Sequence, residues 1–282
     1  MGIQQQQFLN LLLLLALGTF FSNFYLLWYE VITILLFTMF TSHLLNKSFV
    51  SLSSLSTAIG VMLMMVSFNL WIYFVVIGLG LLQKKYLKVN NQHLFNPSNF
   101  ALIFGLLFFY NDAHIILGQL GQELWMVGVL IVLALFILIR VNRWIISLSF
   151  VLFYLFFQYF FLISYDPVLL LEDIYYRFYS VSFLLFILFM LTDPKTTPED
   201  SNFQILFSLL IALCSTLLDR YYGFRVQHLF LSLFFFSLFV PLLNHFNRNS
   251  FLKILLIAFL ATVVIITIEM KTPYYFMMDR RG

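Results

Sequence analysis

The stretch WIISLSFVLFYLFFQYFFLI, residues 144–163, is apolar along almost its whole length and carries no charged side chain. About 20 such residues span the hydrocarbon core of a bilayer as an α-helix. A transmembrane β-barrel would instead show short segments in which apolar and polar residues alternate. The stretch therefore predicts a membrane-spanning helix.

The rest of the chain has the same character. Of its 282 residues, 62% are hydrophobic and 10% are charged, whereas soluble domains contain about 45–50% and about 25%. We therefore predict an all-α polytopic protein, in which residues 1–282 form one integral membrane domain with ten or eleven transmembrane helices in the lipid bilayer. The eleven candidate segments are about 8–22, 24–45, 50–66, 68–83, 99–110, 124–140, 144–164, 178–192, 203–218, 228–245 and 251–269.

Lysine and arginine residues indicate the orientation of the chain. If every segment crosses the membrane, all the cations before residue 144 lie on the side of the N-terminus. Cytoplasmic loops carry the excess of Lys and Arg, so we expect a cytoplasmic N-terminus. Beyond residue 144 the excess of Lys and Arg falls on the other side, so one segment there could fail to cross the membrane. The number of transmembrane helices, ten or eleven, therefore stays open. The opening MGIQQQQ lacks the positive region of a signal peptide, so we expect the first helix to be retained.

Several kinds of site are not expected. The single cysteine, Cys214, argues against a disulfide within the chain and against cysteine-ligated zinc. His228 and His245 bracket one segment at about 25 Å, too far apart to share a haem. The small net charge of +3 is scattered and gives no surface for nucleic acid. We assign no metal ligand and no catalytic residue.

The loop FNPSNF, residues 95–100, precedes an apolar run that is too short to cross the membrane. Asn96 can cap a helix there, with Pro97 at the first helical position. We therefore predict a short or broken helix at 96–110. Unpaired N–H groups at its N-terminus would attract an anionic or carbonyl-rich ligand.

The loop FMLTDPKTTPEDSNF, residues 189–203, predicts a second short or broken helix near 193–203. Asp193 before Pro194, and Thr197 before Pro198, both have the pattern of a helix cap. An acidic group at the edge of an apolar segment is costly unless it is capped, paired or hydrated. Asp193 is therefore either a cap or a group that contacts a ligand.

Two further patterns concern the whole chain. Ser-Asn-Phe occurs at 98–100 and again at 201–203, in each case before an apolar segment, which favours repeat halves of about 24–140 and 144–269. The stretch DRYYGFR, residues 219–225, is typical of an anchor at the membrane interface.

Four stretches together resemble the RnfD/NqrB family, which comprises the D subunit of the Rnf complex and the B subunit of the Nqr complex. The resemblance implies two inverted five-helix repeats, similar to those of urea and ammonium transporters. It also implies a subunit of a membrane electron-transport complex in the bacterial inner membrane, with other membrane redox subunits as partners. The stretches are FNPSNFALIFGLLFF (95–109), GQLGQELWMVGVLIVLALFIL (118–138), FMLTDPKTTP (189–198) and VQHLFLSLFFFSLFVPLLNHF (226–246).

One departure from the family concerns its cofactor. The family attaches flavin mononucleotide (FMN) to a threonine, but residues 110–125, where that threonine should lie, contain none. The chain therefore resembles a divergent branch associated with enediyne biosynthesis, and we expect no covalent FMN. The resemblance instead implies a non-covalent flavin (riboflavin or FMN) or a quinone. The candidate cofactor-binding residues are Asn96, Pro97, Asn99, Thr192, Asp193, Thr196 and Thr197.

Two other function classes stay open at this level. A small-solute transporter or channel could use the same fold without a redox cofactor. A scaffold could use it only to hold partner subunits. If the chain takes part in catalysis, we expect it to do so at most as a subunit of an oxidoreductase complex. Its substrate, redox partner and coupling ion do not follow from the sequence.

Overall fold

The computed structural model of the chain describes residues 2–22, 24–47, 51–89, 92–116, 124–163 and 170–245. In these ranges the chain is almost entirely helical, with two pairs of very short strands. The helices are α1 (Ile3–Phe21), α2 (Trp28–Asn46), α3 (Leu52–Met62), α4 (Leu70–Tyr86), α5 (Pro97–Phe108), α6 (Leu124–Val141), α7 (Trp144–Gln158), α8 (Leu171–Phe178), α9 (Val181–Leu185), α10 (Ser201–Tyr222), α11 (Gln227–Ser237) and α12 (Val240–His245), with π-helical turns η1 (Tyr159–Ile163) and η2 (Phe186–Met190).

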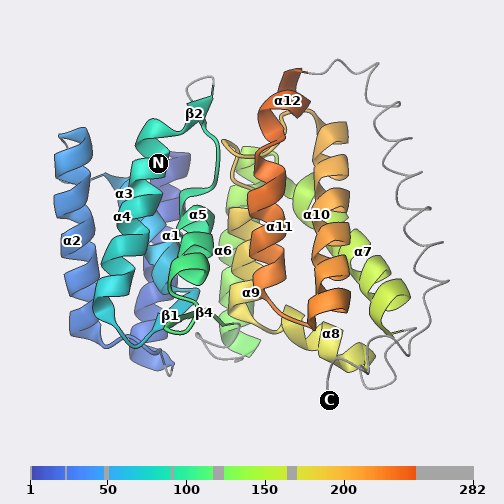
Figure 1. The fold of residues 1–282 in the computed structure, drawn as a ribbon, viewed down its shortest axis with the longest axis horizontal. Coiled ribbons are helices and arrows are strands. Elements are labelled where there is room, and N and C mark those ends of the chain that lie inside the picture. Colours follow the sequence, from blue (N-terminus) through green and yellow to red (C-terminus); the bar gives the residue numbers. More distant parts are fainter. Residues whose placement is uncertain are drawn as a thin grey trace.

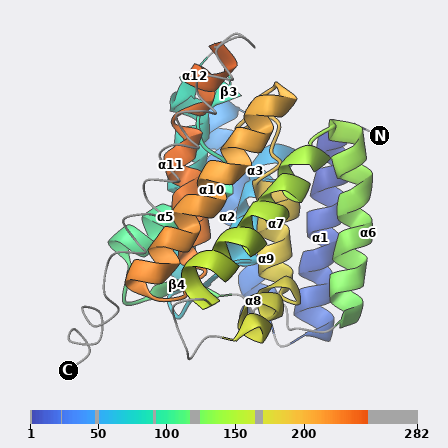
Figure 2. The same cartoon turned by 90° about the vertical axis from the view of Figure 1, so that its right-hand side faces the viewer.

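Most of the helices stand side by side and connect two ends of the molecule (Figure 1). One end, called the hairpin end below, holds α12 and the antiparallel hairpin of β2 (Lys88–Val89) and β3 (Gln92–His93). The other end, called the α8 end, holds α8 and the antiparallel pair of β1 (Met65–Ser67) and β4 (Ala113–Ile115). Figure 2 shows α1 and α6 running beside each other, with α7 and α10 crossing in front of the inner helices.

The all-α polytopic fold agrees with the sequence prediction. Four helices are long and apolar enough to cross a membrane, and α8 with α9–η2 forms a fifth candidate span that is bent by 67°. Three further apolar helices, α3, α5 and α11, are shorter, with between 10 and 17 residues. The predicted segment 251–269 and residues 118–123 of the stretch 118–138 lie outside the described residues. The repeat halves 24–140 and 144–269 stay a prediction.

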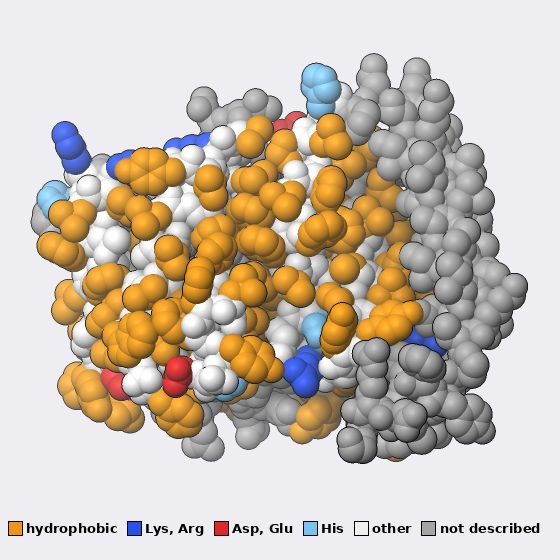
Figure 3. Space-filling model, viewed as in Figure 1, with side chains coloured by type: hydrophobic (Ala, Val, Ile, Leu, Met, Phe, Trp, Pro, Cys, Tyr) orange, Lys and Arg blue, Asp and Glu red, His pale blue; other side chains and the backbone are white. Residues whose placement is uncertain are grey.

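The surface of the helices is apolar, as a lipid solvent requires. Orange hydrophobic side chains cover most of the face seen in Figure 3, and the charged groups lie near its upper and lower edges. On α2, Leu36, Phe40 and Leu44 are exposed at helical spacing. The interior is filled by large aromatic side chains such as Tyr154 and Phe186, which are fully buried. Apolar groups therefore face both the core and the surroundings, and the protein needs a bilayer around it.

The short helix α5 begins where the sequence predicts. The Asn96 side chain accepts hydrogen bonds from the N–H groups of Ser98 at 3.1 Å and Asn99 at 3.2 Å, and Pro97 occupies the first turn. These donors are consequently satisfied within the chain. The expectation that unpaired N–H groups at this end would attract a ligand is wrong, because the cap uses them.

The second predicted start differs from the structure. No helix begins at Pro194; residues 191–200 form a loop, and α10 begins at Ser201 with Asp200 as its N-cap, which accepts from Asn202 N–H at 2.8 Å. Helix α10 has 22 residues and is not short. The short segment lies before the loop, in α9–η2. Local cap patterns occurred several times in this loop, and only Asp200 is followed by a continuous helix.

Candidate functional site

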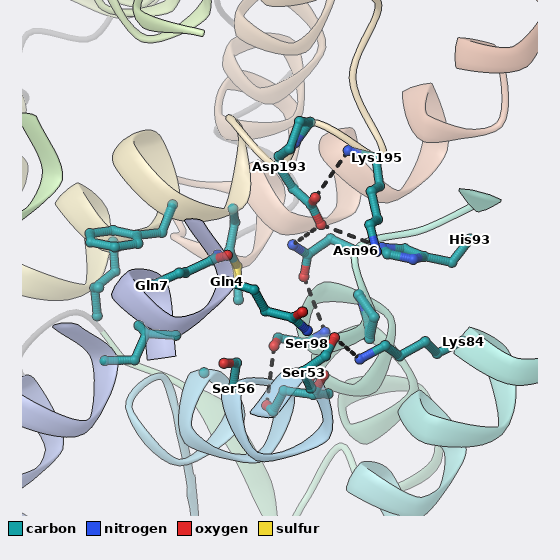
Figure 4. Close-up of a pocket in the computed structure, with 18 of the residues that line it drawn as sticks. Gln4, Gln7, Ser53, Ser56, Lys84, His93, Asn96, Ser98, Asp193 and Lys195 are labelled. Atoms are coloured by element: carbon teal, nitrogen blue, oxygen red, sulfur yellow. Dashed lines mark hydrogen bonds and ion pairs between the residues drawn. The ribbon is translucent and has the colours of Figure 1, made fainter. Parts of the chain in front are cut away.

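The two loops singled out in the sequence meet at the hairpin end. The Asn96 side-chain amide donates a hydrogen bond to the carboxylate of Asp193 at 3.1 Å, although the two residues are 97 positions apart. His93, on β3, places its Nε2 atom 3.5 Å from the same oxygen. Figure 4 shows the three side chains converging. The start of α5, the hairpin and the loop 191–200 are therefore held together by one carboxylate.

The carboxylate of Asp193 is largely shielded from solvent, with 15% of its side chain exposed. Burial, the largest single influence, would raise the pKa of Asp193. The hydrogen bond and charge of His93, together with the N–H and charge of Lys195, outweigh burial, so that the pKa lies below its usual value. That N–H donates to the other carboxylate oxygen at 3.1 Å. Asp193 is thus held in its charged form.

A cavity of about 260 Å³ lies beside this carboxylate. Its wall comes from α1, α3, the C-terminal turn of α4, the start of α5, η2 and the loop 191–200, so that one side is apolar and the other polar. The apolar side is formed mainly by Leu11, Leu63, Met64, Leu185, Phe189 and Met190, and the polar side by Gln4, Gln7, Ser53, Ser56, Lys84, His93, Asn96, Ser98, Asp193 and Lys195.

The π-helical turn η2 shapes the apolar side of the cavity. It contributes Phe189 and Met190 directly before the chain leaves the helix for the loop 191–200. Such turns interrupt the regular hydrogen-bond ladder and are frequent at functional sites. Gly60 on α3 also lines the cavity, where a Cβ atom would lie 2.6 Å from the hydroxyl oxygen of Ser98. A larger residue at this position would displace Ser98.

The cavity brings together three of the seven predicted site residues, Asn96, Pro97 and Asp193. The other four have side chains that are bonded within the protein. The amide of Asn99 donates to the carbonyl of Phe230 on α11 at 3.1 Å. The hydroxyl of Thr192 donates to the carbonyl of Leu188, and those of Thr196 and Thr197 donate to the carbonyl of Asp193. Their visible role is to hold the loop and the helices in place.

Several groups on the cavity wall were not singled out in the sequence. Lys84 served in the sequence analysis only as one of the cations that indicate orientation, and His93 was not assigned to a site. Lys84 Nζ donates to the hydroxyl of Ser53 (Figure 4). Gln4 and Gln7 come from the glutamine run that opens α1. For His93, the sequence offered one indication of a place in the site: it lies only three positions before Asn96, in the same loop that precedes α5.

A second polar cluster lies toward the α8 end, around Asp219. Its carboxylate is fully buried and pairs with Arg177 of α8 at 3.1 Å and His228 of α11 at 2.8 Å. It also accepts hydrogen bonds from the amide of Gln158 and from the N–H of Arg225, both at 3.0 Å. The expectation of an interfacial anchor at 219–225 is therefore wrong for Asp219, which joins α7, α8, α10 and α11 in the interior.

The comparison with known proteins adds a family match. The model of the NQR2, RnfD, RnfE family matches residues 56–253. This range contains both loops of the cavity, the Asn96–Asp193 contact and the Asp219 cluster, but it excludes Ser53 and helix α1. No curated protein matches the chain.

Proposed function

The chain belongs to the NQR2, RnfD, RnfE family, whose model covers well over half of it, and from that premise we propose that its cavity binds a flavin or a quinone non-covalently. The coarser function follows from membership itself: the protein is a membrane subunit of an Rnf/Nqr-type electron-transport complex. The finer proposal concerns what the chain holds within that complex.

The observation that carries the proposal is the cavity built where the Asn-Pro loop and the Thr-Asp-Pro loop meet. A flavin or quinone head is a flat ring with apolar faces and hydrogen-bonding atoms along its edge. Phe189 and Met190 offer an apolar surface to such a face, while Asn96, His93 and Ser98 offer polar groups to its edge. Ligand pockets commonly combine apolar walls with a few convergent polar groups.

The size of the cavity is consistent with a ring rather than a complete large ligand. Its volume of about 260 Å³ lies just below the range of about 300–1,000 Å³ that is common for ligand pockets. The ring would occupy the cavity, and a side chain of the ligand would extend toward the hairpin end. When bound, a flavin or quinone would supply the electron-accepting chemistry, while Asn96 and Asp193 would fix the position of the ring.

Absorption spectroscopy tests the proposal directly. Gently purified protein is scanned for flavin, extracted for quinone, then denatured and run on a gel under ultraviolet light. We expect yellow cofactor to be released on denaturation, or quinone to be extracted. Asp193→Ala should lower the occupancy severalfold, because Asn96 and His93 lose their shared partner. Asp112→Ala, an exposed aspartate between α5 and β4, serves as the matched control.

Other results would contradict the proposal in distinct ways. Fluorescence that stays with the protein band would mean a covalent flavin. A colourless preparation without extractable quinone would favour the alternative of a small-solute transporter or channel, which solute flux into liposomes would then test.

A further inference from the structure

Lys84 is a cation on the cavity wall that forms no ion pair within the described residues. Its Nζ atom donates to the hydroxyl of Ser53, and the described carboxylates do not approach it within 4.0 Å. Asp193, the one acidic group among the described residues that line the cavity, is already bonded to Asn96, His93 and the N–H of Lys195. A partly buried ammonium group with only a hydroxyl partner is poorly compensated.

The cavity wall as a whole carries an excess of positive charge. Lys84 and Lys195 face one carboxylate, that of Asp193, among the described residues that line it. The hydroxyl of Ser53, which accepts a hydrogen bond from Lys84, is neutral and can itself donate a hydrogen bond to an anion. A negatively charged group would therefore be stabilised at this part of the wall.

The position of Lys84 also fits one orientation of a ligand. Lys84 lies in the last turn of α4 and Ser53 in the first turn of α3, both toward the hairpin end, whereas Met190 and Leu63 belong to the apolar side. A ligand with a ring against the apolar side would place its charged end toward the hairpin end, beside Lys84.

We propose that Lys84 and Ser53 bind the phosphate monoester of the ligand, so that the cavity selects FMN over riboflavin. The inference rests on the flavin site proposed above and adds the chemical form of the flavin. Riboflavin has the same ring but lacks the phosphate, and a quinone head carries no anionic group. Lys84 lies within the residues matched by the family model, and Ser53 lies just before them.

Titration of cofactor-free, detergent-purified protein with FMN and with riboflavin tests the inference through the quenching of flavin fluorescence. We expect FMN to bind at least about tenfold more tightly, which corresponds to about 1.4 kcal/mol. Lys84→Gln should reduce the affinity for FMN to that for riboflavin and leave riboflavin binding nearly unchanged. Lys85→Gln is the matched control, because Lys85 Nζ donates to the carbonyl of Leu45 and does not line the cavity.

A second measurement needs no variant. Inorganic phosphate should compete with FMN but not with riboflavin for the wild-type protein. Equal affinities for the two flavins would overturn the phosphate site while leaving the proposed flavin site intact. Binding of neither flavin would instead refute the proposed flavin site. Phosphatidic acid carries the same monoester on a lipid, and tighter binding of it than of FMN would overturn the assignment to a flavin.

Discussion

Asp193 connects three segments through one carboxylate, and its low pKa gives this contact a defined pH dependence. Because the pKa in the folded protein lies below the ordinary value of about 3.9, the carboxylate stabilises the fold fully above that ordinary value. The stabilisation is lost as the pH falls through the lower, folded pKa. Stability should therefore decrease in acid partly through this residue.

The variant Asp193→Asn tests that dependence. At neutral pH it should lower the stability by about 1–3 kcal/mol, because a charged hydrogen-bond acceptor is lost. Its melting temperature should fall less steeply than that of the wild type between about pH 5 and pH 3. Thermal unfolding in one detergent across this range measures both effects. Asp112→Asn should keep the wild-type slope, and equal slopes for all three proteins would contradict the assignment.

Loss of the Asp219 carboxylate should destabilise the protein more than loss of the Asp193 carboxylate, because both charges of the Asp219–Arg177 ion pair are buried. Asp219→Leu should cost about 3–5 kcal/mol, because it leaves Arg177 charged without its partner. The double variant Asp219→Leu/Arg177→Met should recover much of this loss. Chemical or thermal unfolding of the wild type, Asp219→Leu, Arg177→Met and the double variant measures the coupling, with the exposed Glu172→Gln as a control. Simple additivity of the two single losses would show that the pair is not coupled.

At the scale of the elements, the crossing of α4 and α5 positions the cavity wall. Gly80 of α4 allows the close approach, because a Cβ atom there would lie 2.8 Å from the carbonyl oxygen of Pro97 and 3.2 Å from Cβ of Ala101. Pro97 is the first residue of α5 and lines the cavity. A shift of α5 would therefore change the cavity as well as the packing.

Two glycine variants of α4 separate packing from helix propensity. Both Gly80→Ala and Gly78→Ala gain about 1 kcal/mol of helix propensity, but a Cβ atom at Gly78 meets nothing within 4 Å. Gly80→Ala should be destabilised by about 1–3 kcal/mol through overpacking, whereas Gly78→Ala should be neutral or more stable. Melting temperatures in the same detergent measure the difference. Similar shifts for both would mean that α5 moves away freely.

At the scale of the whole molecule, the two ends should face opposite sides of the membrane. The order of a short helix, a longer helix and a short helix occurs in α3–α4–α5 and again in α9–η2, α10 and α11. Figure 1 shows α9 beginning near the α8 end, whereas α3 runs toward that end and leads into β1 there. This opposite sense supports the proposal of inverted halves, which stays a prediction.

Cysteine labelling in oriented vesicles tests the orientation. Because Cys214 is the single cysteine, Cys214→Ser gives a background without thiols. Lys88→Cys and Glu199→Cys, at the hairpin end, should react with a membrane-impermeant reagent only from the cytoplasmic side. Asp112→Cys and Tyr222→Cys should react only from the opposite side. Labelling of all four positions from one side would contradict the placement of the two ends on opposite sides of the membrane. The reverse of the expected pattern would contradict the cytoplasmic N-terminus.

The features that the sequence determined are those that depend on nearby residues or on the solvent. Long apolar runs such as 144–163 require lipid around them whatever they pack against, so the helical membrane fold followed from composition and segment length. The start of α5 followed from Asn96 and Pro97, because a cap acts on N–H groups only two or three residues away. The loop after Met190 offered several such patterns, and local chemistry could not choose Asp200 among them.

Only the tertiary structure decided which polar groups share a site. Lys84, His93 and Asp193 come from different elements, and their meeting depends on how those elements pack. Asp219 is buried because α8 and α11 bring Arg177 and His228 to it, which no periodicity in 219–225 indicates. The physical reason is the distance along the chain over which each interaction acts. Solvent preference and helix capping depend only on residues a few positions apart. Ion pairing and the shape of a cavity depend on contacts between segments that lie far apart in the chain.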